Sequence, residues 1–183
     1  MSCILGRQTV VVSPTIRAPR TDELEQLREI ERAAGDLFAE IGLEQVAAAE
    51  PASVEALAQC VLDGRAWLIA DGDVPFGYAV VDVVDGLAHL EQLSVLPNRG
   101  RQGFGAALLE HVCDWATRHR FAGVTLTTFT EVPWNAPFYA KHGFRVMNDS
   151  EVGPELRERR ALEAAHGLDP AQRVCMRRDA GPA

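Results

Sequence analysis

The stretch SVLPNRGRQGFGAALLEHV, residues 94–112, places three glycines and two arginines between an apolar run typical of a strand and one typical of a helix. A helix N-terminus presents backbone N–H groups without partners and a partial positive charge. Glycines allow an anion to approach these groups closely. Gly103 and Gly105 stand where the helix begins, and Arg99 and Arg101 flank the loop. The segment therefore predicts a site for a phosphate or pyrophosphate.

The sequence on either side of this loop indicates the fold class. Before the loop, apolar runs at 66–70, 74–84 and 87–95 are separated by DGD and DG, which favour tight hairpin turns, so we expect three antiparallel strands. After the loop come a helix with apolar residues at helical spacing and the β-branched run VTLTTF at 124–129. A strand, a helix and a further strand predict a parallel pair with a right-handed crossover. The fold class is therefore α/β with a mixed sheet.

The remaining elements complete one domain over residues 1–183, with residues 1–13 as a flexible N-terminal segment. Apolar spacing predicts helices from Thr21 to Ile41 and from Ser53 to Leu62. Further elements are expected as a short helix at 135–141, a strand at 144–147, a charged helix at 153–169 and a last strand at 173–178. The charges of the 153–169 helix fit a solvated face better than a lid or a dimer contact.

Composition limits the classes of function. The chain has 183 residues, 47% hydrophobic and 24% charged, as in ordinary globular proteins. A net charge of -8 argues against nucleic acid as the main partner and suits a cationic acceptor, although solubility explains it equally well. There is no signal-peptide pattern and no apolar window of 18 residues, so we expect a cytoplasmic protein without membrane contact. The four cysteines lack metal-ligand spacing, which predicts no metal site.

Two phosphate-binding interpretations compete for the glycine-rich loop. A dinucleotide-binding loop needs G-x-G-x-x-G and an acidic residue near the end of the next strand. Residues 100–105 read G-x-x-G-x-G instead, and no carboxylate follows the strand until Glu131. This interpretation is therefore the weaker one.

The stretches LEQLSVLPNRGRQGFGAALLEHV at 90–112 and NAPFYAKHGFRV at 135–146 together resemble the GCN5-related N-acetyltransferase (GNAT) family. The signature of that family is a strand ending near V-x-P, then [QR]-x-x-G-x-[GA], and later Y-x-x-x-G-F. The resemblance covers most of the chain. It implies a bent mixed sheet of about six to seven strands flanked by helices, in which the strands at 87–95 and 121–129 splay apart. Acetyl-CoA would lie in the gap between them.

The resemblance also implies which residues bind acetyl-CoA. The pantetheine arm would pair with backbone groups of Leu93 and Val95, and the pyrophosphate would rest on amides of the loop. The full set is Leu93, Ser94, Val95, Arg99, Arg101, Gln102, Gly103, Phe104, Gly105, Ala106, Asn135, Phe138 and Tyr139.

Two positions depart from the family pattern. Gly100 stands where the family usually has Gln or Arg, which leaves open whether Arg99 or Arg101 contacts phosphate. The family often places an Asn seven residues before the tyrosine, whereas Asn135 lies four before Tyr139. We therefore favour a helix-capping role for the Asn135 side chain over a cofactor contact.

Acetyl transfer to an amine needs a base. An amine with a pKa near 10.4 is only about one part in two thousand neutral at pH 7, which costs roughly 4 to 5 kcal/mol. Strand alternation predicts that His89, Glu91, Leu93 and Val95 share one face. By resemblance Glu91 is the first candidate base and His89 the second. The alternatives are a solvated strand residue or an arginine partner for Glu91, and a structural role for His89.

The resemblance assigns Tyr139 as the general acid for the leaving thiolate, and a backbone amide near Leu93 as the donor to the oxyanion of a tetrahedral intermediate. The resemblance therefore implies an acetyl-CoA-dependent N-acetyltransferase. The acceptor is a small-molecule or protein amine, and a homodimer stays open. Phe38, Tyr78, Glu91 and Trp134 are candidates to line the acceptor pocket, although Trp134 fits a core aromatic slightly better. The alternative function is a non-catalytic acyl-CoA-binding or regulatory module.

Overall fold

The computed structural model describes residues 13–181, in which seven strands form one sheet in the order β1-β2-β3-β4-β5-β7-β6. Apart from Ser13, the flexible segment expected at residues 1–13 lies outside the described residues. Every neighbouring pair is antiparallel except β4 with β5. The strands are β1 (Thr15–Arg17), β2 (Ala66–Asp71), β3 (Val74–Val84), β4 (Leu87–Val95), β5 (Gly123–Phe129), β6 (Arg145–Val146) and β7 (Arg173–Asp179). The predicted mixed sheet is confirmed, and β1 is an edge strand that the sequence did not predict.

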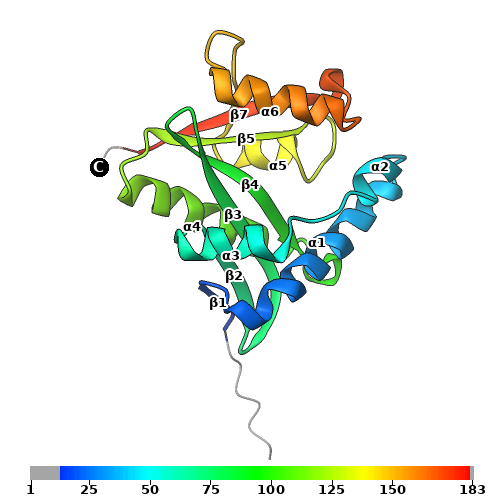
Figure 1. The fold of residues 1–183 in the computed structure, drawn as a ribbon, viewed down its shortest axis with the longest axis vertical. Coiled ribbons are helices and arrows are strands. Elements are labelled where there is room, and N and C mark those ends of the chain that lie inside the picture. The colour runs from blue at the N-terminus through cyan, green and yellow to red at the C-terminus, as the bar shows by residue number, and fades with distance from the viewer. Residues whose placement is uncertain (1–12, 182–183) are drawn as a thin grey trace, which may run out of the picture.

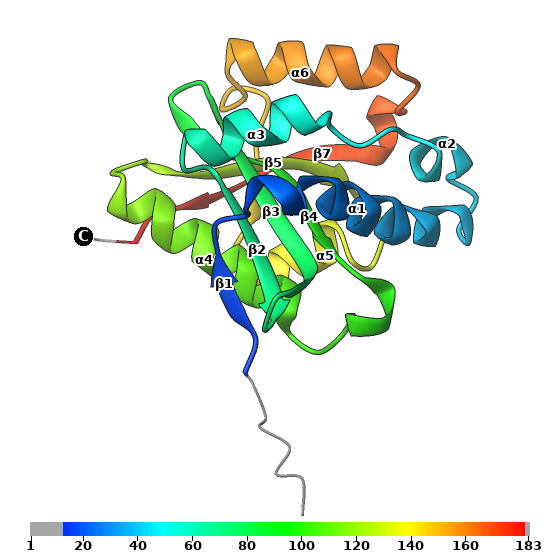
Figure 2. The same ribbon diagram turned by 60° about the horizontal axis from the view of Figure 1, so that its bottom comes forward.

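Helices cover both faces of the sheet, as Figures 1 and 2 show. One face carries α1, α3 and α6, and the opposite face carries α4 and α5. The helices are α1 (Leu24–Ala39), α2 (Glu44–Ala47), α3 (Val54–Leu62), α4 (Phe104–Arg118), α5 (Ala136–Lys141) and α6 (Pro154–Ala165). No helix within residues 13–181 is long and apolar enough to cross a membrane.

Each face has its own apolar core. Leu108, Leu109 and Val112 of α4 pack against β3, β4 and β5 in the largest cluster. A second cluster holds α1 and α3 on the other face, and a small third cluster lies beneath α6. Cys113 and Cys175 are both only 8% exposed within these clusters, which confirms that they pack as small apolar residues.

Strands β4 and β5 separate soon after they meet. Their parallel pairing comprises Ala88 with Val124 and His89 with Thr125, whereas β4 continues to Val95. The second half of β4 therefore has hydrogen-bonding groups that β5 does not use. This confirms the predicted splay and leaves a strand edge to which an extended ligand can add.

A β-bulge at Glu91 overturns the predicted face of β4. Val80 pairs with Gln92 and Val81 with Leu90, so Glu91 has no partner residue on β3. An extra residue reverses the alternation beyond it. Leu93 and Val95 consequently pack with Ala88 and Leu90 on the α4 face, while His89 and Glu91 lie on the α6 side. The expectation that His89, Glu91, Leu93 and Val95 share one face was wrong.

Candidate active site

The first turn of α4 has the geometry of an anion site. Gly103, the residue before the helix, has φ +87°, a left-handed conformation that favours glycine. The amide of Ala107 donates to the Gly103 carbonyl at 2.9 Å as the first helical hydrogen bond. The amides of Phe104, Gly105 and Ala106 precede it and point out of the helix start. They are the donors predicted for a pyrophosphate.

Three elements converge beside this turn. A Cβ atom added to Gly105 would lie 3.8 Å from Cζ of Phe138 on α5 and 3.9 Å from Cγ2 of Val95 on β4. The end of β4, the start of α4 and the aromatic side of α5 therefore meet at the mouth of the gap between β4 and β5. Three of the cofactor residues predicted from the sequence, Val95, Gly105 and Phe138, are brought together here.

The two loop arginines are not equivalent. The Arg99 guanidinium pairs with Asp71 of β2 and lies 4.9 Å above the Phe76 ring. Arg101 is exposed, has φ +58°, and makes no ion pair with any residue in the described part of the chain. Of the two, Arg101 is the cation that remains available to a bound phosphate.

Asn135 does not cap α5 as expected. It occupies the residue before the helix, but its side chain makes no capping hydrogen bond. Its Nδ2 atom instead donates to Oγ1 of Thr128 on β5 at 2.8 Å, which fixes the amide against the splayed strand. Its Oδ1 atom is buried and has no hydrogen-bond partner among residues 13–181. Because buried acceptors normally find a donor, this oxygen fits a ligand N–H group.

Tyr139 packs on the α4 face of the sheet. Its ring contacts Phe138 and Phe144, with centroids 5.2 and 5.8 Å away. Burial raises the pKa of its phenol, so the hydroxyl keeps its proton at neutral pH. A protonated phenol is the state required of a general acid.

The candidate bases lie on the opposite face. His89 is 2% exposed, and its Nδ1 atom is 2.9 Å from Thr125 Oγ1. Burial lowers the pKa of His89 to about 4, and the Arg159 guanidinium acts in the same direction. The His89 ring is therefore neutral at physiological pH. Its Nε2 atom is 4.0 Å from Glu91 Oε2, so the two candidate bases are neighbours.

Glu91 pairs with Arg159 of α6. Loss of surrounding water raises the pKa of Glu91, and the Arg159 guanidinium opposes that rise. Half of the Glu91 side chain remains exposed, so the carboxylate lies at a boundary between protein and solvent. Glu91 therefore has an arginine partner, as one of the alternatives predicted, and its carboxylate also remains accessible to solvent.

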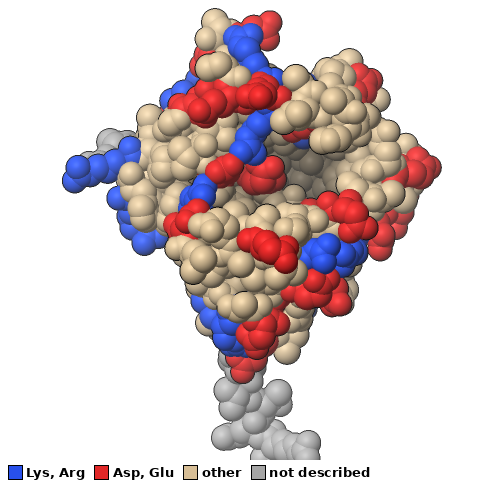
Figure 3. All heavy atoms as spheres, viewed as in Figure 1, with Lys and Arg blue, Asp and Glu red and all other residues tan. Residues whose placement is uncertain are grey.

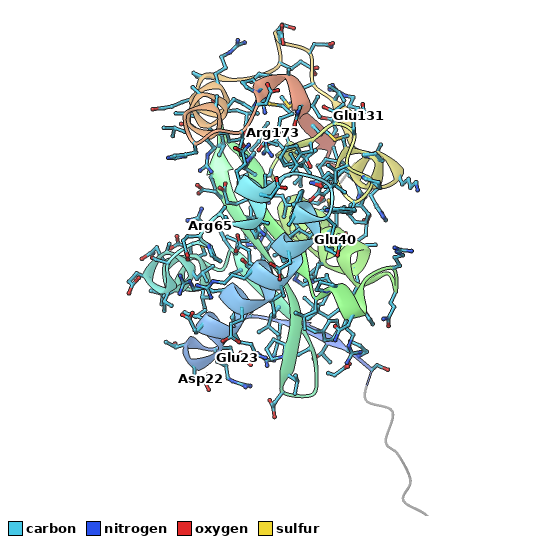
Figure 4. The ribbon with its side chains drawn as sticks, turned by 90° about the vertical axis from the view of Figure 1, so that its right-hand side faces the viewer. Asp22, Glu23, Glu40, Arg65, Glu131 and Arg173 are labelled. Atoms are coloured by element: carbon cyan, nitrogen blue, oxygen red, sulfur yellow. The ribbon has the colours of Figure 1, made fainter. Side chains whose placement is uncertain are left out.

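Helix α6 is not the plain solvated helix that its charges predicted. The amides of Glu155 and Leu156 donate to the Asp85 carboxylate on the β3–β4 turn, both at 3.0 Å. Further along, Glu163 pairs with Arg173 of β7 at 3.0 Å, and Figure 4 labels Arg173. Charged side chains on two sides of α6 therefore tie it to both halves of the splayed sheet.

The proposed acceptor pocket is partly assembled. Figure 3 shows a hollow between α1, α2 and the strands, with charged side chains along its edge. The Phe38 ring is 5.7 Å from both Phe129 and Trp134, and Trp134 is 39% exposed, so it is not a core aromatic. Tyr78 was wrongly placed in this pocket: it is fully buried and its hydroxyl donates to Glu31.

Sequence reasoning missed Arg159, Asp82 and Thr125, all of which surround the candidate bases. Arg159 lies 68 residues after Glu91, and no motif marks it. Thr125 stands in the β-branched run that predicted β5, but only the register of β4 against β5 shows that it faces His89. Within the described residues, no group of three His, Cys, Asp or Glu side chains could hold a metal ion.

Two cavities lie away from the splayed strands. One of about 230 Å³ is lined by residues including Cys113, Gly123 and Arg178. The other, about 270 Å³, lies under the β3–β4 turn beside Thr125 and Leu156. Neither of these two cavities includes the start of α4 or Tyr139.

Comparison with known proteins finds similar N-acetyltransferases. Over 84 residues the chain is 30% identical to an uncharacterized N-acetyltransferase, YjcF, of Bacillus subtilis. This match covers 46% of the chain and spans 58% of the length of that relative.

Solved structures share the fold. The ribosomal-protein-S18-alanine N-acetyltransferase of Escherichia coli superposes with a TM-score of 0.64 at 20% identity, over 93% of this chain and 96% of that one. The PaiA N-acetyltransferase of Thermoplasma acidophilum, in complex with coenzyme A, gives 0.65 at 17% identity, over 91% and 99%. The sequence model of the acetyltransferase (GNAT) family matches residues 25–144. This chain belongs to the acetyltransferase (GNAT) family.

Proposed function

We propose that the protein transfers the acetyl group of acetyl-CoA to a primary amine. The observation that carries this proposal is the separation of β4 from β5 beyond His89 and Thr125, with the first turn of α4 at the mouth of the gap. Family membership supports the reaction class. A single domain carries both the cofactor groove and the acceptor hollow.

The residues present fit acetyl-CoA. Amides at 102–106 and the Arg101 guanidinium would hold the pyrophosphate. Backbone groups of Leu93 and Val95, with Ser94 between them, would pair with the pantetheine arm as a strand would. The unpartnered Asn135 oxygen would accept from a pantetheine amide. When bound, the thioester supplies an activated acyl group that an amine attacks directly through a tetrahedral intermediate.

Glu91 would remove the proton from the acceptor ammonium. Its carboxylate is half exposed and lies on the face of the sheet that carries α1 and α6, so an amine can reach it. His89 is neutral, its Nδ1 atom faces the Thr125 hydroxyl, and its Nε2 atom is the ring nitrogen near Glu91. Glu91 is therefore the first candidate base. His89 is the second, and it would act in place of Glu91.

Tyr139 would return a proton to the leaving thiolate, because burial keeps its phenol protonated. A backbone amide near Leu93 would donate to the oxyanion, a contact typically worth some 2.7 to 4 kcal/mol in acyl transfer. The Leu93 region lies beyond the bulge, where β4 no longer pairs with β5.

The acceptor is proposed as a small-molecule or protein amine that enters the hollow beside Phe38 and Trp134. The net charge of -8 favours a cationic amine over a nucleic acid. Neither a membrane nor a metal has a role in this proposal, the protein is expected in the cytoplasm, and the site does not require a homodimer.

Thiol release tests the proposal. Protein, acetyl-CoA and a panel of small amines and lysine peptides are mixed, free CoA thiol is followed, and acetylated product is identified by mass spectrometry. The expected result is amine-dependent thiol release that falls at least about tenfold in a Gly105→Val variant at subsaturating acetyl-CoA. Tight CoA binding without thiol release from any amine would instead support the non-catalytic acyl-CoA-binding module.

A further inference from the structure

A chain of alternating charges leads from α3 to Glu91. Arg65 pairs with Asp63 and, at 2.6 Å, with Asp82 of β3. The second oxygen of Asp82 pairs with Arg159, and Arg159 also pairs with Glu91. Arg159 thus bridges two carboxylates on neighbouring strands, next to the bulge that separates Glu91 from the regular ladder.

We propose that Arg159 is a positioning residue that holds the Glu91 carboxylate ionised and directed toward the acceptor hollow. This inference rests on the proposed function of Glu91 as the base. Because the bulge leaves Glu91 without a partner residue on β3, the backbone ladder does not fix its side chain. The guanidinium supplies that restraint from a helix that is itself tied to both halves of the sheet.

Arg159 is held firmly enough for this role. Asp82 fixes it from one side, and Arg65 in turn fixes Asp82, with Arg65 and Arg159 side chains 20% and 30% exposed. At the start of α6, the Asp85 carboxylate binds the Glu155 and Leu156 amides. A network of this kind loses less side-chain entropy per ion pair than an isolated surface pair.

Glu91 is surrounded by acidic side chains, and the Arg159 guanidinium opposes their effect on its carboxyl group. Asp82, Glu163 and Glu31 lie near enough to disfavour a further negative charge. His89 is neutral and supplies no cation, and burial raises the pKa of the Cys60 thiol, so that thiol adds no further negative charge. Arg159 is the opposing charge in direct contact, and without it the Glu91 carboxyl would retain its proton to higher pH.

The experiment follows the Glu91 carboxyl directly. In protein labelled with ¹³C at the glutamate carboxyls, the Glu91 resonance is assigned by its loss in Glu91→Gln and titrated with pH. In Arg159→Gln we expect its midpoint to rise by about 1 pH unit or more. Arg159→Lys, which keeps the charge, should return the midpoint most of the way to its wild-type value. Arg157→Gln is the matched control, because Arg157 lies on the same helix but donates to the Val152 carbonyl.

A second readout uses the reaction. In Arg159→Gln the acidic limb of the pH profile of kcat/KM should move to higher pH, by the same number of pH units as the carboxyl midpoint. An unchanged Glu91 midpoint in folded Arg159→Gln, or an equal shift in Arg157→Gln, would overturn the proposal. If wild-type protein acetylates no amine, the proposed function fails, whereas the carboxyl titration still decides the role of Arg159.

Discussion

The His89 imidazole on β4 contacts the Thr125 hydroxyl on β5 at the last paired residues before these strands separate, with Nδ1 and Oγ1 2.9 Å apart. Both side chains are almost fully buried, at 2% and 1% exposed. This polar contact therefore lies at the point where β4 and β5 separate, next to Glu91, the first candidate base.

Loss of the Thr125 hydroxyl should destabilise the protein. Thr125→Val keeps the shape but leaves the buried His89 Nδ1 atom without its partner, which should cost about 1 to 3 kcal/mol in the free energy of unfolding. Thr125→Ser keeps the hydroxyl and loses one methyl group, so it should cost only about 0.8 kcal/mol. Urea unfolding at pH 7 measures both. A valine variant as stable as wild type would show that the contact contributes nothing.

Burial of neutral His89 should make stability depend on pH. The folded pKa of about 4 lies below the ordinary value of 6.5. Between these values the unfolded chain binds more protons than the folded one. The contribution of His89 to the free energy of unfolding is therefore fully present above pH 6.5. It falls as the pH drops toward 4, by about 3 kcal/mol in total.

His89→Gln provides the comparison for this pH dependence, because it removes the imidazole and retains a group that can bond Thr125. The difference between wild-type and variant unfolding free energies is measured by urea denaturation from pH 7.5 to 4. We expect that difference to change steadily between pH 6.5 and 4. A constant difference over this range would mean that His89 has an ordinary pKa in the folded protein.

Substitution of Glu91 should lower kcat more than substitution of Tyr139. Glu91→Gln removes the proposed base and should lower kcat by about 100-fold or more. Tyr139→Phe should lower it less, because a thiol with a pKa near 8.5 leaves without much assistance. Steady-state thiol release at saturating acetyl-CoA compares them. A far larger loss in Tyr139→Phe would assign the rate-limiting proton transfer to the tyrosine.

The Asp85 contact should stabilise α6. Its carboxylate accepts from two first-turn amides of the helix, and Asp85 itself has φ +51°. Asp85→Ala should cost about 1 kcal/mol and increase amide exchange in the first turn of α6. Asp85→Asn keeps one acceptor oxygen and tolerates the positive φ, so it is the matched control. Equal exchange rates in all three proteins would rule out a capping role.

Much of the fold was predictable because its signals are local. The period of the apolar residues and the Gly-containing turns indicate β2, β3, β4 and β5 within one or two residues of their ends, and they indicate α4 directly after the glycine-rich loop. The helix start proposed as an anion site was equally predictable, since the left-handed residue Gly103 before the helix requires no distant partner.

The candidate site was less predictable because it depends on register and distant contacts. The bulge at Glu91 arises from pairing against β3, which strand alternation does not contain. The partner of Glu91, Arg159, comes from a helix that sequence alone indicated as solvated. Asn135 occupies the position where a helix cap is expected, but its side chain donates a hydrogen bond to Thr128 of β5 instead.

Binding of CoA to the groove at the start of α4 is the central claim, and amide NMR tests it most directly. Gly105→Val is the matched variant, since a Cβ there meets only ordinary contacts at 3.8 and 3.9 Å, while the branched side chain would stand in the path of the pyrophosphate. We predict that CoA shifts the amides of 93–95 and 102–106 in wild type and binds Gly105→Val at least about tenfold more weakly. Saturable binding with those amides unmoved, or equal affinity for both proteins, would contradict the account.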